Sequence, residues 1–206
     1  MHDLHDDPEQ GLRAAEARRR QARTEGDWEN YRIAHQDVLR LERQLAAGKG
    51  EEYAEPCDFP LKWDVGAPLP HLLTNDNRAL LAFAVLDQDP TYERGEQQLG
   101  LVEFEGCLSA KLGTPSDEVF QGHPLYRKGL EACSAQRVVN SRWLRELEAI
   151  SSVHSRHRPE RFRGLTHYVF WFKDSTFECV AGAFTVTTRR TSMTALLGVM
   201  VERLMS

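Results

Sequence analysis

An aromatic-rich stretch at residues 165–187, LTHYVFWFKDSTFECVAGAFTVT, constrains the fold more than any other part of the chain. Aromatic and β-branched residues favour strands because they fit a pleated, packed surface. Asp174 and Ser175 interrupt the run, and both are turn residues whose side chains bond nearby backbone groups. The stretch therefore predicts a β-hairpin with these two residues at its tip.

The position of the turn determines which residues of the hairpin share a face. With the turn at residues 174–175, Trp171 lies opposite Glu178 and His167 lies opposite Gly182. Because side chains alternate with period two, these residues share one face, and the other rings share the opposite face. We assign the aromatic face to the core and expect the His167 face to form a partly open cleft. In this register His167 and Glu178 lie about 13 Å apart along the ladder, which excludes direct contact.

Size and composition are those of an ordinary globular protein. The chain has 206 residues, 41% hydrophobic and 28% charged, which suffices for one sizeable domain with an appendage. A net charge of -5 gives no support for a nucleic-acid surface, which would be basic. No apolar run approaches the ~20 residues of a membrane span, and the acidic N-terminus lacks the apolar core of a signal peptide. Four isolated cysteines favour free thiols. We therefore expect a cytoplasmic protein that binds neither nucleic acid nor membrane.

The N-terminal part of the chain predicts a helical hairpin. Residues 8–23 are rich in helix formers, Gly26 ends this helix, and Asp27 fits the N-cap of a second one. Apolar residues at three- and four-residue steps give the second helix one apolar stripe, and the pair is similar to a single tetratricopeptide unit. A lone repeat cannot bury such a stripe by itself. We expect residues 1–48 to pack on the domain of residues 49–206 or to form a homodimer contact.

The order of the remaining elements indicates an α+β fold. The patterns predict strands at residues 78–87, 99–108 and 134–140 in addition to the central hairpin. Amphipathic helices are predicted at residues 142–153 and 192–205. Because the strands cluster rather than alternate with helices, we expect a mostly antiparallel sheet of about five strands, with helices packed on one side.

Six motifs between residues 63 and 179 form a recognisable pattern. They are WDVGAPLP, FEGC, PSDE, GHPLYRKGL, VVNSRW and HYVFWFKDSTFEC. Together they resemble a widespread group of uncharacterised bacterial proteins. That group has Asn at the position of Ser116 and His at the position of Lys173, so this chain is similar to a diverged member. The resemblance implies no activity, substrate or cofactor, and it assigns a role to no residue.

The open face of the hairpin is the first candidate site. A carboxylate and an imidazole in an aromatic-lined cleft are what acid–base catalysis requires, because partial burial moves their pKa values toward neutrality. His167 and Glu178 are the candidate catalytic groups. The candidate ligand-binding residues on this side are Trp171, Glu103 and Glu105. The alternative is a wet sheet face with a solvated glutamate and a satisfied histidine.

The motif GHPLYRKGL is the second candidate site. Its glycines and proline fix an unusual backbone, and a loop of this kind suits a ligand-binding role. His123 is a candidate catalytic group, and Tyr126 and Arg127 are candidate ligand-binding residues. The alternative is a structural loop in which His123 and Tyr126 tie the backbone. His154 and His157 have HxxH spacing but no third ligand nearby, so we expect no metal site.

Two functional hypotheses follow. The chain contains no GxGxxG, GxxxxGK[ST] or GxSxG motif, and no cofactor is indicated. The first hypothesis is a ligand- or partner-binding accessory protein that takes a small polar ligand or a protein partner. The alternative is a small acid–base enzyme acting on a polar metabolite or peptide, with His123 or His167 and Glu178 or Glu105. A single enclosed pocket lined by His123, His167 and Glu178 would strengthen the enzyme hypothesis, and positions scattered over separate surfaces would weaken it.

Overall fold

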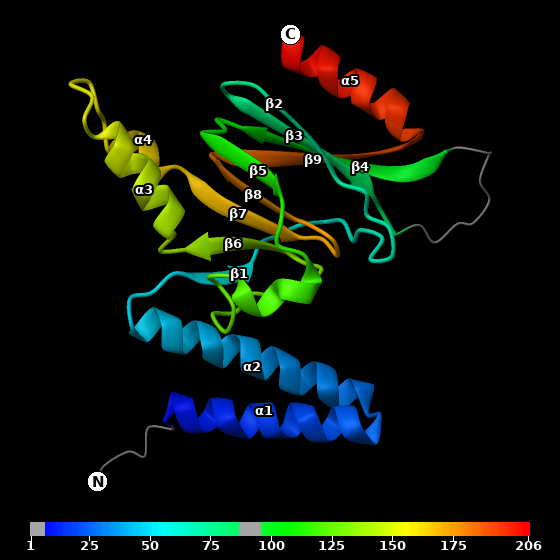
Figure 1. The fold of residues 1–206 in the computed structure, drawn as a ribbon, viewed down its shortest axis with the longest axis vertical. Coiled ribbons are helices and arrows are strands. Elements are labelled where there is room, and N and C mark those ends of the chain that lie inside the picture. The colour runs from blue at the N-terminus through cyan, green and yellow to red at the C-terminus, as the bar shows by residue number, and fades with distance from the viewer. Residues whose placement is uncertain (1–6, 87–95) are drawn as a thin grey trace.

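The computed structural model describes residues 7–86 and 96–206. It contains two antiparallel sheets, of five and four strands, with helices on their outer faces and a helical pair at the N-terminal end (Figure 1). The predicted α+β class and the N-terminal helical hairpin are confirmed. The prediction of one sheet of about five strands with helices on one side is corrected: the strands form two sheets, and each sheet has its own helix contacts, α5 (Met193–Met205) on one and α3 (Arg142–Ser151) on the other.

The N-terminal hairpin consists of α1 (Pro8–Glu25) and α2 (Trp28–Gly48). Gly26 ends α1 in the left-handed conformation with φ 72°, which glycine adopts without steric cost. The side chain of Asp27 accepts a hydrogen bond from the backbone N–H of Asn30, which confirms the predicted N-cap. The buried residues between the two helices are Leu12, Ala15, Val38 and Leu41.

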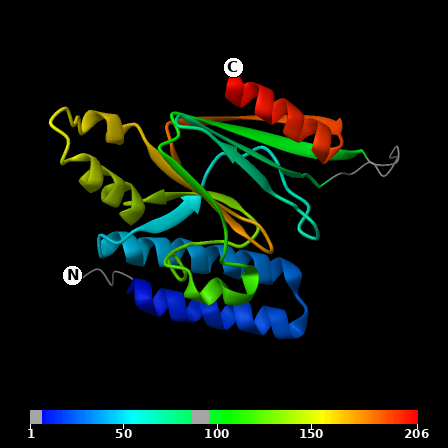
Figure 2. The same cartoon turned by 45° about the horizontal axis from the view of Figure 1, so that its top comes forward.

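Helix α2 attaches the hairpin to the rest of the fold, and it lies between α1 and the sheets in both views (Figures 1 and 2). Arg43 donates from Nε to the carbonyl of Ala54 at 2.9 Å and from Nη2 to the carbonyl of Gly129 at 3.2 Å. The carboxylate of Glu42 accepts from the backbone N–H of Gly129 at 3.2 Å. Ala54 belongs to β1 (Tyr53–Pro56), so polar contacts join the hairpin to a sheet edge.

The five-stranded sheet has the order β1-β6-β7-β8-β5. Its other members are β6 (Ala135–Val139), β7 (Thr166–Trp171), β8 (Thr176–Ala181) and β5 (Ser109–Gly113). Every neighbouring pair is antiparallel. The predicted central hairpin therefore lies inside this sheet, with a strand on each side of it.

The four-stranded sheet has the order β2-β3-β4-β9. It contains β2 (His71–Thr74), β3 (Arg78–Ala84), β4 (Gln97–Glu105) and β9 (Ala183–Thr191). Helix α5 (Met193–Met205) covers its outer face. The buried residues of this contact are Leu80, Ala82, Ala84, Leu99, Leu101, Leu196 and Met200.

Two glycines carry the chain from one sheet into the other. Gly106 separates β4 from β5, and Gly182 separates β8 from β9, so one strand pair contributes to both sheets. Gly106 has φ 60°, and the N–H of Gly182 donates to the carbonyl of Glu105 at 2.9 Å. A strand that bends at such a corner lets two sheets close over one core.

The β7–β8 hairpin confirms the predicted faces and corrects the predicted register. Trp171 lies opposite Thr176, whereas the sequence predicted Glu178 at that position. The N–H of Phe172 donates to the carbonyl of Ser175 at 2.9 Å, so the tip consists of residues 173–174. Moving the tip by one residue shifts every cross-strand pair by two, and an even shift leaves each side chain on its own face.

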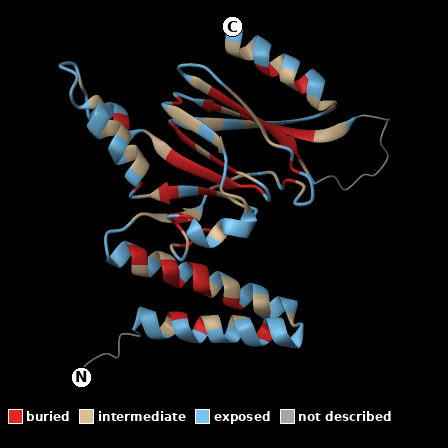
Figure 3. Cartoon of the chain, viewed as in Figure 1, coloured by how far each residue is buried: buried red, intermediate tan, exposed pale blue. Residues whose placement is uncertain are grey.

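The core between the sheets is built largely from aromatic rings, and Figure 3 shows the buried residues concentrated on the strands. Aromatic rings of β7 and β8 pack against Trp63, Phe83 and Phe104. The ring centroids of Trp63 and Phe170, for example, lie 6.1 Å apart. Cys179 is also in this core, as the aromatic-face assignment predicted. The opposite face of the hairpin carries His167 and Glu178.

A long connection covers part of that opposite face. Residues 114–131 contain the 3₁₀ helix η1 (Asp117–Gly122) and lie over the middle of the five-stranded sheet. Helix α3 (Arg142–Ser151) follows β6 and contacts β7, and the short α4 (Glu160–Arg163) precedes β7. The side chains of this small core are Ala54, Phe120, Leu125, Leu130, Val138, Val169 and Trp171.

Candidate functional site

A pocket of about 650 Å³ lies on the outer face of the five-stranded sheet. Lys111 of β5, His167 of β7 and Glu178 of β8 reach it from three strands. The first turn of α3 and the connection of residues 114–125 form its remaining walls. The pocket therefore combines strand, helix and loop residues that lie far apart in the sequence.

All three predicted catalytic residues line this pocket: His123, His167 and Glu178. His123 and His167 are buried, with 7% and 3% of their surface exposed. The side chain of Glu178 is 12% exposed. The convergence that the sequence could not establish is therefore present in the structure.

The predicted separation of His167 and Glu178 is wrong, because Nε2 of His167 lies 2.9 Å from Oε2 of Glu178. In the observed register Glu178 lies opposite Val169 and His167 lies opposite Val180. His167 and Glu178 are thus diagonal neighbours on one face, a position that long side chains can bridge. The two-residue shift in pairing explains the whole error.

Glu178 is held as a carboxylate by two donors. Its Oε1 accepts from Nζ of Lys111 at 2.8 Å, and its Oε2 faces the imidazole of His167. Burial alone would raise the pKa of Glu178, but the hydrogen bonds and charges of His167 and Lys111 outweigh it and bring the pKa to about 2. Glu178 is therefore ionised at neutral pH.

The second nitrogen of His167 also has a partner inside the protein. Nδ1 lies 2.8 Å from Oγ of Ser141, and this oxygen accepts from the N–H of Leu144 as the N-cap of α3. An ionised Glu178 can only accept, so Nε2 of His167 carries a proton. In the neutral ring Nδ1 then accepts the hydroxyl proton of Ser141. Neither nitrogen of His167 is free to exchange a proton with a ligand.

His123 presents a different arrangement. The N–H of Leu125 donates to Nδ1 of His123 at 3.1 Å, so Nδ1 is unprotonated and the neutral ring carries its proton on Nε2. Burial lowers the pKa of His123, which favours this neutral form, and the ring packs edge-on against Trp171 with centroids 5.2 Å apart. Within residues 7–86 and 96–206, Nε2 of His123 has no hydrogen-bond partner. It is an N–H donor at the pocket wall.

Sequence reasoning missed several residues of the pocket. Lys111 lies over the ring of Trp143 at 4.6 Å while its ammonium binds Glu178, and Trp143 in turn contacts the ring of His167. Arg142 donates from Nε to Glu146 at 2.7 Å. The motif VVNSRW contains Ser141, Arg142 and Trp143, and its sequence pattern indicates only a helix that begins at Arg142. No sequence signal marked β5, the strand that carries Lys111.

All five predicted ligand-binding residues lie outside the lining of this pocket. Trp171 was expected on an open face, but it is fully buried beneath Phe120 and Leu125 of the covering connection. Tyr126 and Arg127 instead line a separate pocket against the helical hairpin. Arg127 forms an ion pair with Glu16 of α1 at 2.8 Å.

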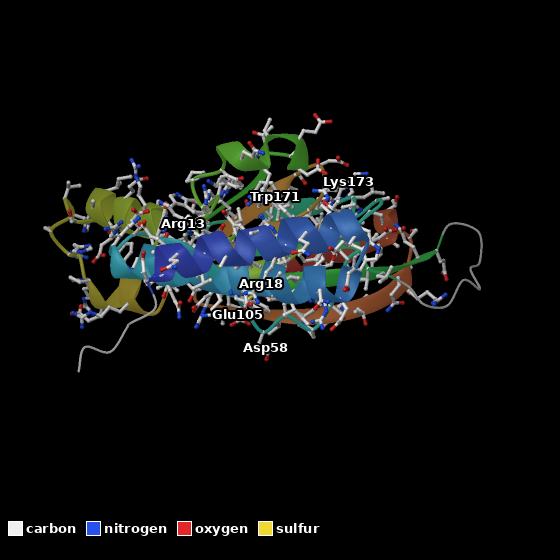
Figure 4. The ribbon with its side chains drawn as sticks, turned by 90° about the horizontal axis from the view of Figure 1, so that it is seen from below. Arg13, Arg18, Asp58, Glu105, Trp171 and Lys173 are labelled. Atoms are coloured by element: carbon white, nitrogen blue, oxygen red, sulfur yellow. The ribbon has the colours of Figure 1, made fainter. Side chains whose placement is uncertain are left out.

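The glutamates of β4 belong to the other sheet. Glu103 accepts from Arg203 of α5 at 3.1 Å and lies 3.8 Å from Arg78, so it anchors the C-terminal helix. Glu105 is exposed next to the corner glycines, and Figure 4 shows it on the side of the fold opposite Trp171. The expected grouping of these two residues with His167 is wrong, because β4 and β7 belong to different sheets.

Two further features concern the described part of the chain as a whole. There, no group of three or more His, Cys, Asp or Glu side chains is arranged to hold a metal ion. None of the helices in the same ranges combines the length and the apolar character needed to cross a membrane.

Comparison with known proteins gives no relative: no family model, no curated protein and no solved structure matches this chain. The resemblance of its motifs to an uncharacterised bacterial group therefore stays a prediction. The function has to be argued from the pocket itself.

Proposed function

We propose that the protein binds a small polar ligand in the pocket of His123 and acts as a binding or accessory protein. The observation that carries this proposal is the contrast between the two histidines. The ring nitrogens of His167 are both engaged inside the protein, whereas Nε2 of His123 is an N–H donor without a partner among the described residues. An N–H donor that opens into a pocket and lacks a protein partner is available to a ligand that supplies an acceptor.

The state of Glu178 argues against acid–base catalysis by the predicted pair. A carboxyl group with a pKa of about 2 is a weak base and holds no proton to donate at neutral pH. Its two oxygens already bind Lys111 and His167. Glu178, Lys111 and His167 instead hold one another in place at the base of the pocket. Lys111 lies between the carboxylate of Glu178 and the ring of Trp143.

The chemistry of the pocket suggests the kind of ligand. His123, Lys111 and Arg142 offer N–H donors, and Trp143 offers a flat apolar surface. Glu52 and Glu146 add carboxylate acceptors to the lining. A ligand that combines a carboxylate or carbonyl acceptor, a polar donor and a compact apolar part fits this lining. Amino acids and small organic acids have this character. The volume of about 650 Å³ lies within the usual range of small-molecule sites.

The convergence of three candidate catalytic groups keeps an enzyme as the second candidate. In that case His123 would act as a neutral electrophile, donating from Nε2 to a substrate carbonyl as charge develops on its oxygen. The substrate would again be a polar metabolite or peptide. For this role the substrate would occupy the same position next to His123 as the ligand of the proposed binding protein.

The predicted protein partner stays part of the proposal. A contact through the N-terminal helices would cover Trp28, which is 67% exposed at the start of α2. A cytoplasmic location rests on the sequence alone.

Replacing His123 by Phe should weaken ligand binding by about tenfold or more, because the ring packing is retained and one hydrogen bond to the ligand is lost. Amino acids, hydroxy acids and dicarboxylic acids serve as probes, and binding is followed by chemical-shift changes of the Trp143 indole N–H. His71→Phe is the matched control, since His71 does not line the pocket. Equal affinity in the His123→Phe variant would contradict the proposal, as would the failure of every probe to bind.

A further inference from the structure

A second cavity, of about 610 Å³, lies at the opposite end of α3 from the His123 pocket. It is bounded by the end of α3, by α4 and the loop between them, and by the sheet corner at Gly106. Its basic lining residues are His154, Arg156, His157, Arg158 and Arg161. We name it the basic cavity.

The arginines of the basic cavity have no counter-ion among the described residues. In the described ranges, no carboxylate lies within ion-pair distance of Arg156, Arg158 or Arg161. Several other arginines of the described ranges are paired, as Arg127 is with Glu16 and Arg142 with Glu146. Three such arginines around one cavity are informative because the whole chain has a net charge of -5 and 31 acidic residues. An acidic protein that leaves three guanidinium groups together around one cavity provides a site for an external anion.

The other polar groups of the lining modify this charge only slightly. Among the described residues, Asp76 is the one acidic residue that lines the cavity. His154 accepts the N–H of Arg156 at Nδ1, so its neutral ring has an N–H at Nε2. His157 contacts Ser151 at 3.3 Å and lies 4.0 Å from Glu148. The balance of the lining remains positive.

We propose that the basic cavity binds the phosphate group of a small phosphorylated molecule. Guanidinium groups present planar pairs of N–H donors that match phosphate oxygens, and three of them can surround a doubly charged phosphate monoester. The cavity volume is typical of small-ligand sites. The overall negative charge of the chain disfavours an extended nucleic acid, which requires a broad basic surface.

Calorimetric titration of the full chain at physiological salt tests this proposal, with glycerol phosphate and inorganic phosphate as probes and glycerol as the uncharged control. Glycerol phosphate should bind and glycerol should not. Arg158→Ala and Arg161→Ala should each weaken binding by about tenfold, the loss expected for a charge-assisted hydrogen bond. Arg163→Ala is the matched control: Arg163 belongs to α4 and is exposed, but it does not line the cavity. It should change the affinity by less than about twofold.

Several outcomes would overturn the proposal. If neither phosphate probe binds, the site is excluded. Equal losses of affinity in Arg163→Ala and Arg158→Ala would mean that phosphate is attracted by the general positive charge of this surface and not by the cavity. Tighter binding of a single-stranded oligothymidine than of glycerol phosphate, with the same arginine dependence, would assign the surface to nucleic acid instead. Because every substitution is at an exposed residue, the variants should fold, and their circular dichroism spectra check this directly.

Discussion

Replacing Gly129 by Ala should lower the free energy of unfolding by about 3 kcal/mol or more. Gly129 has φ 79°, a conformation that costs an L-residue on the order of 1 kcal/mol. A Cβ atom there would also lie 2.6 Å from the carbonyl oxygen of Ala54 and would overlap the side chain of Arg43. Relieving that overlap moves Arg43, whose two hydrogen bonds attach α2 to β1 and to the connection at Gly129. Urea denaturation of both proteins measures the loss.

Gly26 provides the matched control, because it has a similar left-handed conformation, φ 72°, and a Cβ atom added there would meet no atom within 4 Å. Gly26→Ala should therefore show only the conformational cost, about 1 kcal/mol. Equal losses at Gly26 and Gly129 would mean that the close approach of α2 and β1 at Gly129 is not part of the folded protein.

Glu178 should make the protein sensitive to acid. A solvated glutamate titrates near 4.5, whereas the pKa of Glu178 in the folded protein is about 2. Because the folded pKa lies below the unfolded one, the stabilisation is complete above about pH 5 and is lost as the pH falls toward 2. At 1.36 kcal/mol per pH unit the difference amounts to on the order of 3 kcal/mol. Glu178→Gln should lack this part of the pH dependence.

The measurement is the free energy of unfolding of the unaltered protein and of Glu178→Gln across this acidic range. Glu146→Gln is the control, since Glu146 lines the same pocket but its side chain is 52% exposed and its ion pair with Arg142 is solvated. Its curve should stay within about 0.5 kcal/mol of the unaltered protein. Parallel curves for Glu178→Gln and the unaltered protein would show that Lys111 and His167 do not hold the carboxylate.

The hairpin shows how far local sequence information reaches. Period-two alternation was sufficient to divide residues 165–187 into a core face and an outer face, and that division is confirmed. The register depends on which two of Lys173, Asp174 and Ser175 form the tip. The sequence predicted Asp174 and Ser175, but the hydrogen bond from the N–H of Phe172 to the carbonyl of Ser175 places the tip one residue earlier. The face of each side chain depends only on whether its position is odd or even, so a two-residue error in pairing leaves it unchanged. The distance between two side chains on facing strands depends on the pairing itself.

The site was only partly predictable because its walls come from non-local packing. His167 and Glu178 were identified from residue type and predicted strand face, and His123 from its loop motif. All three line one pocket. The burial of Trp171 depends on the covering connection, whose broken pattern of glycines and prolines gave no direction for its path. Lys111 lies on a short strand with no clear alternation, so its contact with Glu178 had no signal in the sequence.

The central claim is that His123 is the neutral donor of the pocket while His167 is engaged within the protein. A long-range ¹H–¹⁵N correlation spectrum of the imidazole nitrogens at neutral pH tests it most directly. We expect His123 to show an unprotonated Nδ1 and a protonated Nε2, and to remain neutral as the pH falls below the usual histidine range, because burial lowers its pKa. A His123 ring that is charged, or protonated at Nδ1, at neutral pH would contradict the account.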